Sequence, residues 1–296
     1  MVYEIENHDL SHRVDEAEKR RLEESSEKWI NIVFSHPGHA IKSASVFEVR
    51  SKFMTAADAR AAYIETWEYW VLAMQAYNAM LRLEAATEGD EVDLFIGRQG
   101  KTIQAPKNSS DLNARTWVNS FFYSMVCRHE KNLNYLCSIP VDSIRERGES
   151  EGTEYAQYVY HWISALQAVV LHRDGFDEEL AAAIEQSDPE VSGFGDDESV
   201  GRLVFPEMLV LLRLVERDSE KFNEALAAGV AAFGEYWTAT ESRANNINGV
   251  FPLGLLAFAC MAYDIAQVDP DFELDVVSGY LPKHLVEHSW FDEFPI

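Results

Sequence analysis

Three residues near the C-terminus have the types and the spacing of a metal site. His284, Glu287 and His288 spell H-x-x-E-H, the pattern in which two histidines bind zinc and the glutamate acts as a base. The alternative is a short amphipathic helix after Pro282, with its polar residues in water. Because the pattern is short and needs a third ligand that the sequence does not place, we favour the helix and predict no bound metal.

A second cluster, Asp196, Asp197 and Glu198, has the composition of a magnesium site in helical isoprenoid enzymes. The cluster follows Gly-Phe-Gly at the expected start of a helix. Acids at this position cap free amides and interact favourably with the helix dipole. We therefore interpret these acids as a helix cap.

His161 is the third candidate for chemistry, because it lies between Tyr160 and Trp162 in an apolar helical stretch. A lone histidine in such a place is usually a hydrogen-bonded core residue. The sequence contains no Gly-rich phosphate loop, no G-x-S-x-G elbow and no C-x-x-C pair. We therefore predict no catalytic residue and no cofactor.

The charge of the chain favours a protein partner. The chain has 50 acidic and 25 basic side chains, and its formal net charge is -25. This balance disfavours nucleic acid, whose binding needs Lys and Arg, and favours a basic protein. The simpler alternative is that the charge only keeps the protein soluble.

The acids are also clustered along the chain. Nine acids and no Lys or Arg lie from Asp177 to Glu198, and four more acids crowd the approach to a predicted hairpin. An acidic edge of this kind steers a basic partner towards the protein. The residues that we predict to bind a partner are Glu88, Asp90, Glu91, Asp93, Asp174, Asp177, Asp196, Asp197 and Glu198.

Helices must position these residues, because helical periodicity dominates the sequence. We expect a charged peripheral helix from Val14 to Phe34, a break at Pro37, a second helix from Ala40 to Met54 and a long central helix from Thr55 to about Ala86. The core stripe of the long helix consists of Ile64, Trp67, Val71, Met74 and Leu81.

One stretch has a β-strand pattern. Val92, Leu94 and Ile96 point to one face at a period of two, and Gly97 and Gly100 supply a turn. We expect one small hairpin near residues 92–105, followed only by helices and short connections.

The later helices recur at a regular interval. Three stretches run from an apolar helix through basic residues to an acid and into a second helix, and these acids are Glu130, Asp174 and Asp218. Each interval is 44 residues, in the range of helix-pair repeats. We interpret the acids as residues at the N-terminus of each second helix, and we expect a fourth copy near Asp269 or Asp271.

Two further stretches affect how these helices pack. Tyr155 to Leu171 is apolar almost all round and should be enclosed. Pro206 lies inside a helical run from Leu203 to Val215, and it should either kink this helix or mark its start.

The C-terminal stretch from Val250 to Ile265 is apolar and predicts a buried helix. An acidic turn and a tail follow, and Trp290, Phe291 and Phe294 make the tail too aromatic to remain in water. We expect the tail to dock on the core and to close the last helix pair as a cap.

The cysteines and the lengths of the apolar runs indicate in which cellular compartment the protein is expected. The three cysteines are an odd count in apolar helical contexts, so a reducing cytoplasm is expected. No uninterrupted apolar run reaches the roughly 18 residues that span a bilayer, and the N-terminus lacks the layout of a signal peptide. We expect a soluble, cytoplasmic protein with no membrane partner.

Several segments carry a family resemblance. They are TWEYWVLAMQ (Thr66 to Gln75), YVYHWISALQ (Tyr158 to Gln167), SDPEV (Ser187 to Val191), KFNEAL (Lys221 to Leu226), EYWTA (Glu235 to Ala239), LGLLAFACMAYD (Leu253 to Asp264), YLPKHL (Tyr280 to Leu285) and SWFDEFP (Ser289 to Pro295). In this order they resemble the immunity 49 family of bacterial polymorphic toxin systems. The resemblance is strongest over the final fifty or so residues.

The resemblance implies a helical protein, encoded beside a secreted toxin, that binds the toxin in the producing cell. Neutralisation would occur by occlusion and not by catalysis, and the resemblance identifies no contact residues. The alternatives are a helical metal-dependent enzyme and a general helical-repeat adaptor.

We predict an all-α fold of antiparallel helical hairpins, packed as a repeat-like array or as a closed bundle, with one small β-hairpin. One domain is expected over residues 1–296, with peripheral helices in residues 1–54 and the main helical body in residues 55–296. The sequence leaves the oligomeric state open.

Overall fold

The computed structural model describes residues 2–14, 25–107, 109–193 and 196–296. It is 64% helical with two small strand pairs in the part described, which confirms the predicted all-α class. The chain divides into two compact units. Unit 1 contains the residues up to Leu10 and Tyr155–Ser289, and unit 2 contains Ser11–Glu154 and Trp290–Ile296. The single domain expected from the sequence stays a prediction.

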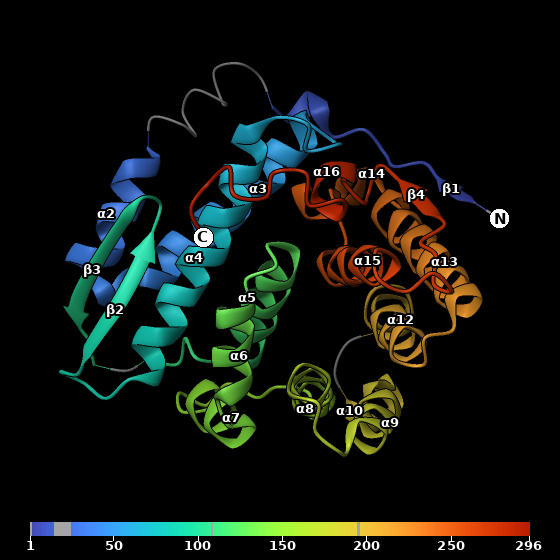
Figure 1. Ribbon diagram of the computed structural model, residues 1–296. Coiled ribbons are helices and arrows are strands. Elements are labelled where there is room, and N and C mark those ends of the chain that lie inside the picture. Colours follow the sequence, from blue (N-terminus) through green and yellow to red (C-terminus); the bar gives the residue numbers. More distant parts are fainter. Residues whose placement is uncertain (1, 15–24, 108, 194–195) are drawn as a thin grey trace. The chain divides into compact units, whose positions relative to one another are not determined.

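Unit 2 is built around α4, a helix of 22 residues that packs between α3 and α5 (Figure 1). Most of its residues are buried, including the predicted stripe from Trp67 to Leu81, while Ile64 is half-buried. The elements of unit 2 are η1 (Ser11–Arg13), α2 (Ser26–Ser35), η2 (Pro37–His39), α3 (Ala40–Ala57), α4 (Ile64–Ala85), β2 (Glu91–Ile96), β3 (Gln99–Gln104), α5 (Ala114–Val126), α6 (Glu130–Ser138) and α7 (Val141–Gly148).

The expected long helix from Thr55 is wrong, because Thr55 lies in the last turns of α3 and α4 begins only at Ile64. The turn between them is left-handed at Ala61, with φ of 50°. The Asp58 carboxylate accepts hydrogen bonds from the backbone N–H groups of Ala62 and Tyr63, at 3.0 and 2.9 Å. Asp58, which suggested a helix start at Thr55, therefore stabilises the turn between α3 and α4.

The helices before this turn also differ from expectation. The predicted first helix falls partly on residues 15–24, which lie outside the described residues, and its described part is α2. The boundary expected between residues 54 and 55 falls inside α3, which buries Phe47 and Arg50 in unit 2.

The predicted hairpin is confirmed as the antiparallel pair of β2 and β3. Leu94 and Ile96 are buried, as their period-two pattern requires. The turn begins at Gly97, where φ is 65° and an added Cβ would come within 2.9 Å of Cδ1 of Ile30. Glycine therefore allows the tip of the hairpin to lie directly on α2.

Unit 1 contains helices and one parallel strand pair, and its cysteine, Cys260, is buried. Its elements are β1 (Tyr3–Ile5), α8 (Tyr158–Leu171), α9 (Phe176–Ser187), α10 (Pro189–Ser192), α11 (Asp197–Ser199), the π-helix η3 (Val200–Val204), α12 (Phe205–Val215), α13 (Ser219–Thr238), α14 (Glu241–Ala244), η4 (Ile247–Gly249), α15 (Leu253–Ala266), β4 (Val276–Ser278) and α16 (Lys283–Val286).

Helices pack in three consecutive pairs, α5 with α6, α8 with α9, and α12 with α13 (Figure 1). A left-handed residue follows the first helix of each pair: Arg128, His172 and Arg217, with φ of 53°, 49° and 58°. These positions are 44 and 45 residues apart. The predicted repeat is thus present as a recurring helix end, with the first pair in unit 2 and the other two in unit 1.

The expected fourth helix pair is wrong. After α15 the chain forms a loop and then β4, which pairs in parallel with β1 from Tyr3–Val276 to Ile5–Ser278. The sequence predicted only helices here. Each strand has three residues, too few to show a period of two.

Two helices of unit 1, α8 and α12, agree with the predictions made for them. No residue of α8 is exposed. Pro206 lies in the first turn of α12, directly after the π-helix, so it marks the start of this helix.

The helix α15 forms part of the core of unit 1, with Leu256 and Phe258 fully buried. Among the described residues, one segment, Ile247–Ala266, is long and apolar enough to cross a membrane. In its most apolar window, 72% of the residues are buried inside the protein, as expected of a core helix.

The aromatic tail docks only in part. The indole N–H of Trp290 donates a hydrogen bond to the carbonyl of Ala61 at 2.8 Å, and Phe294 is 6% exposed. Phe291 is 69% exposed, so the expectation that it is buried is wrong. The tail belongs to unit 2 and packs by the turn between α3 and α4, whereas the sequence predicted that it closes the last helix pair.

Candidate binding surfaces

All nine acids predicted to bind a partner are exposed. Glu88, Asp90, Glu91 and Asp93 lie in unit 2, at and before β2. The other five, Asp174, Asp177, Asp196, Asp197 and Glu198, lie in unit 1, between α8 and η3. The exposure makes each of these residues accessible, and their local contacts decide which charges are available to a partner.

Two of the acids near the hairpin are used locally. A carboxylate oxygen of Asp90 accepts a hydrogen bond from the backbone N–H of Thr87 at 3.3 Å, which closes the turn before β2. Asp93 accepts a hydrogen bond from the hydroxyl of Thr102 on the paired strand, at 2.5 Å. Both contacts stabilise the hairpin.

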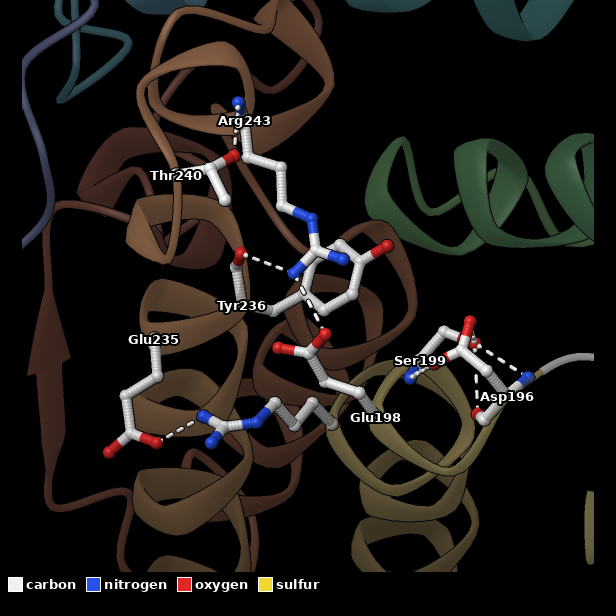
Figure 2. A network of polar contacts seen from close by, with 8 residues as sticks. Asp196, Glu198, Ser199, Glu235, Tyr236, Thr240 and Arg243 are labelled. Atoms are coloured by element: carbon white, nitrogen blue, oxygen red, sulfur yellow. Dashed lines mark hydrogen bonds and ion pairs between the residues drawn. The ribbon is translucent and has the colours of Figure 1, made fainter.

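Asp196 is a helix cap, as the sequence predicted (Figure 2). Its Oδ1 accepts a hydrogen bond from the backbone N–H of Ser199 at 2.8 Å, and the Ser199 side chain contacts the Asp196 backbone in return. These hydrogen bonds hold the pKa of Asp196 below its usual value. This geometry is a reciprocal capping box, and the local contacts of Asp196 are therefore structural.

Glu198 belongs to a small polar network with the end of α13 (Figure 2). The Arg243 guanidinium donates a hydrogen bond to Glu198 at 3.0 Å and lies 4.0 Å from the ring centre of Tyr236. Nearby, Arg202 pairs with Glu235. The carboxylate of Glu198 is thus neutralised within unit 1 and is a weaker candidate for partner binding.

The side chains of the remaining five acids form no hydrogen bond and no ion pair in the described part of the chain. They are Glu88, Glu91, Asp174, Asp177 and Asp197. These exposed side chains are therefore the members of the set that are available to attract a basic partner over a distance.

The turns of the repeat do not form a uniformly acidic edge. In unit 1, the C-terminal ends of α8, α12 and α15 line a common pocket of about 320 Å³. Its polar residues include His172, Arg173 and Arg217, which directly precede the acids Asp174 and Asp218 in the chain. Attraction of a basic partner at this end is therefore weaker than the acids alone suggested.

The acids at the second helices have different roles. Asp218 caps α13, because Oδ1 accepts a hydrogen bond from the backbone N–H of Lys221 at 3.1 Å, as interpreted from the sequence. Glu130 is the first residue of α6, but His129 supplies the cap. Asp174 precedes Gly175, the residue at the cap position of α9.

The H-x-x-E-H pattern does not lie on one helix. The helix α16 ends at Val286, and His288 has a left-handed backbone with φ of 50°. Nδ1 of His284 instead lies 3.0 Å from the hydroxyl of Ser289. In the described residues, no group of three or more His, Cys, Asp or Glu side chains could hold a metal ion.

His161 links the two helices of a pair. Its Nδ1 lies 2.7 Å from a carboxylate oxygen of Glu179 on α9, and its Nε2 lies 3.2 Å from the Gln186 amide. The side chain is 32% exposed, so His161 is hydrogen-bonded as expected but lies at the edge of the core.

Glu207 in unit 1 has a strongly raised pKa, and no pattern in the sequence pointed to it. The residue is only half-buried, but its carboxyl group faces Gly254, where an added Cβ would come within 2.5 Å of it. Loss of water raises the pKa of Glu207 from the ordinary 4.5 to about 8, although the backbone N–H of Gly254 donates a hydrogen bond to it. Gly254 lies in the first turn of α15, whose N-cap residue is Pro252. Glu207 therefore accepts a hydrogen bond from one of the free backbone N–H groups at the N-terminus of α15.

Comparison with protein-family models places these features in one family. The immunity protein 49 family matches residues 58–285, which is most of the chain and includes α4 to α16 except for the last residue of α16. Neither a comparison with curated proteins nor one with solved structures gave a match. The match extends over parts of both compact units and agrees with the mainly helical fold. The chain therefore belongs to the immunity protein 49 family.

Proposed function

We propose that this protein neutralises a cognate bacterial toxin by binding it and covering its active surface. The observation that carries the proposal is the family match over residues 58–285, because an immunity family suggests a toxin-neutralising role. Such families are generally non-catalytic. Neutralisation by occlusion needs no catalytic residue, and it fits a chain in which the candidate catalytic patterns serve helix ends and turns.

The charge of the protein supports a basic toxin. A net charge of -25 and five exposed acids without a partner in the described residues favour a positively charged surface. The same charge disfavours nucleic acid and anionic membranes as partners. We place the complex in the cytoplasm of the producing cell, where a newly made toxin must be blocked.

Co-expression tests this function. The gene is expressed with the product of the neighbouring toxin gene in a sensitive strain, and growth is compared with that of cells that carry the toxin alone. Restored growth, together with a complex that co-purifies, supports the proposal. Continued killing at high expression of the folded protein contradicts it.

A further inference from the structure

Unit 2 contains a groove with an apolar floor. Its volume is about 580 Å³, and it is lined by α2, α4, the turn of the hairpin and the C-terminal tail. Tyr69, Leu72 and Phe294 form the floor and are at most 6% exposed. The floor therefore offers a ligand a small apolar area at the bottom of an already formed groove.

The rim of this groove is acidic. Glu27 on α2 and Glu65 on α4 are exposed, and Glu68 on α4 is half-buried. Among the described residues that line the groove, the basic one is Arg98, whose guanidinium lies 3.9 Å from Glu68. Arg50 lies behind the rim, where it is buried and donates a hydrogen bond to Ser26 at 2.7 Å. In the part of the chain that the structure describes, three acids and one cation lie on the rim, which gives these lining residues a net negative charge.

The negative charges of the rim are close enough to affect one another. Burial raises the pKa of Glu68, and the charge of Glu65 raises it further, against the opposite effect of Arg98. A carboxylate in this position is stabilised by any additional cation that approaches it. The groove thus favours a positively charged ligand group.

Arg98 shows how such a cation fits. Its guanidinium lies 4.9 Å from the ring centre of Phe294 and next to Glu68, so it combines an aromatic contact with an ion pair. The Arg98 side chain is 66% exposed, and at 3.9 Å its ion pair is long. A weak and exposed pair of this kind is easily exchanged for a cation of a partner.

We infer that the groove between α2, α4 and the hairpin turn binds a basic segment of the toxin, with an Arg or Lys side chain between Glu65 and Glu68 and its stem over Phe294. The inference rests on the proposed function, because it assigns the docking site of the same partner. Isolated acids such as Asp174 and Asp177 would then only attract the toxin, whereas the groove would hold it.

Matched double variants distinguish residues that slow dissociation of the toxin from residues that only speed its association. Glu65→Gln with Glu68→Gln and Asp174→Asn with Asp177→Asn each remove two negative charges, one pair in the groove and the other outside it. We expect the groove variant to raise the dissociation rate of the toxin complex by about tenfold or more, and the control to change mainly the association rate, by about threefold or less. Stopped-flow or surface-binding kinetics with purified toxin measure both rates, and thermal unfolding verifies that both variants are folded.

A third variant changes the charge in the opposite direction. Arg98→Gln removes the cation that already occupies the groove, so we expect the toxin to bind severalfold more tightly. Equal dissociation rates for the wild type and the groove variant, or weaker binding of Arg98→Gln, would overturn the assignment while leaving the proposed function intact. A wild-type protein that does not bind the toxin at all would overturn the proposed function itself.

Discussion

Glu207 differs from the capping acids because its carboxyl group has lost most of its water and has no cation to compensate. Its pKa of about 8 lies far above the 4.5 of an ordinary glutamate. Between these two pH values the folded protein holds a proton that the unfolded chain releases. Stability from this group is therefore complete below about pH 4.5 and is lost as the pH rises through about 8.

Replacement of Glu207 by glutamine should remove this dependence. We expect Glu207→Gln to be more stable than the wild type at about pH 9 and to show a flatter stability profile between about pH 5 and pH 9. Denaturant unfolding at several pH values measures the effect. The matched control is Glu224→Gln, a change at an exposed glutamate of α13. Parallel profiles for the wild type and Glu207→Gln would show that the group is not desolvated.

The two kinds of acid also show what could be predicted at this scale. Asp196 and Asp218 were interpreted correctly as acids at helix starts, because a cap involves residues within about three positions of each other. Glu207 could not be found in this way. Its environment is created by Gly254, which lies on another helix and reaches Glu207 only after folding.

Helix ends are the recurring elements of this chain. Arg128, His172 and Arg217 each adopt a left-handed backbone that costs a residue with a side chain roughly 1–2 kcal/mol. We expect His172→Gly to leave the free energy of unfolding unchanged or to raise it by up to about 1 kcal/mol, because glycine adopts this backbone freely.

The control for this prediction is Ala181→Gly, at an exposed position inside α9. It should lower the free energy of unfolding by about 1 kcal/mol. Chemical denaturation of both variants measures the difference. A loss of stability in His172→Gly as large as that in the control would contradict the role of this residue as a helix terminator.

The C-terminal tail offers a second matched pair. Phe294 is 6% exposed and Phe291 is 69% exposed, although the residues are three positions apart. We expect Phe294→Ala to destabilise unit 2 by about 3 kcal/mol, through loss of buried surface and a cavity. Phe291→Ala should change stability by less than about 0.5 kcal/mol. Similar losses in denaturant unfolding of the two variants would show that the tail is not docked through Phe294.

Elements with long periodic patterns were predicted best. The hairpin and the stripe of α4 follow from periods of two and about 3.6 residues, and both are confirmed. The break between α3 and α4 was missed because the residue with the left-handed backbone there is Ala61, and an alanine gives no sign of a break, unlike a Pro or Gly. The β1–β4 pair was missed because it depends on a contact between distant segments of three residues each.

At the scale of the whole molecule, the family was predicted from many modest segments in order, and the family match confirms it. The division into two units was not predicted. The boundary after Glu154 falls in the connection between α7, which ends at Gly148, and α8, which begins at Tyr158, and a connection between two helices does not by itself mark the end of a compact unit. The residues that contact a toxin depend on the partner as well, and their assignment stays a prediction.

Net charge is a property of the whole molecule, and it predicts how fast the complex forms. At a net charge of -25, the association rate with a basic toxin should fall by about tenfold or more between low salt and about 0.5 M salt. The dissociation rate should change much less. Binding kinetics over a range of salt concentrations measure both rates. An association rate that does not depend on salt would exclude electrostatic attraction.

Occlusion without catalysis is the central claim, and a titration of toxin activity tests it most directly. Purified toxin is mixed with increasing amounts of the protein at concentrations well above the dissociation constant, and the remaining activity is measured. We expect activity to fall linearly and to end at a fixed ratio of the two proteins, with active toxin recovered when the complex is dissociated. Complete and permanent inactivation by a small fraction of this amount would show that the protein acts as an enzyme, and undiminished activity at excess protein would show that it does not neutralise this toxin.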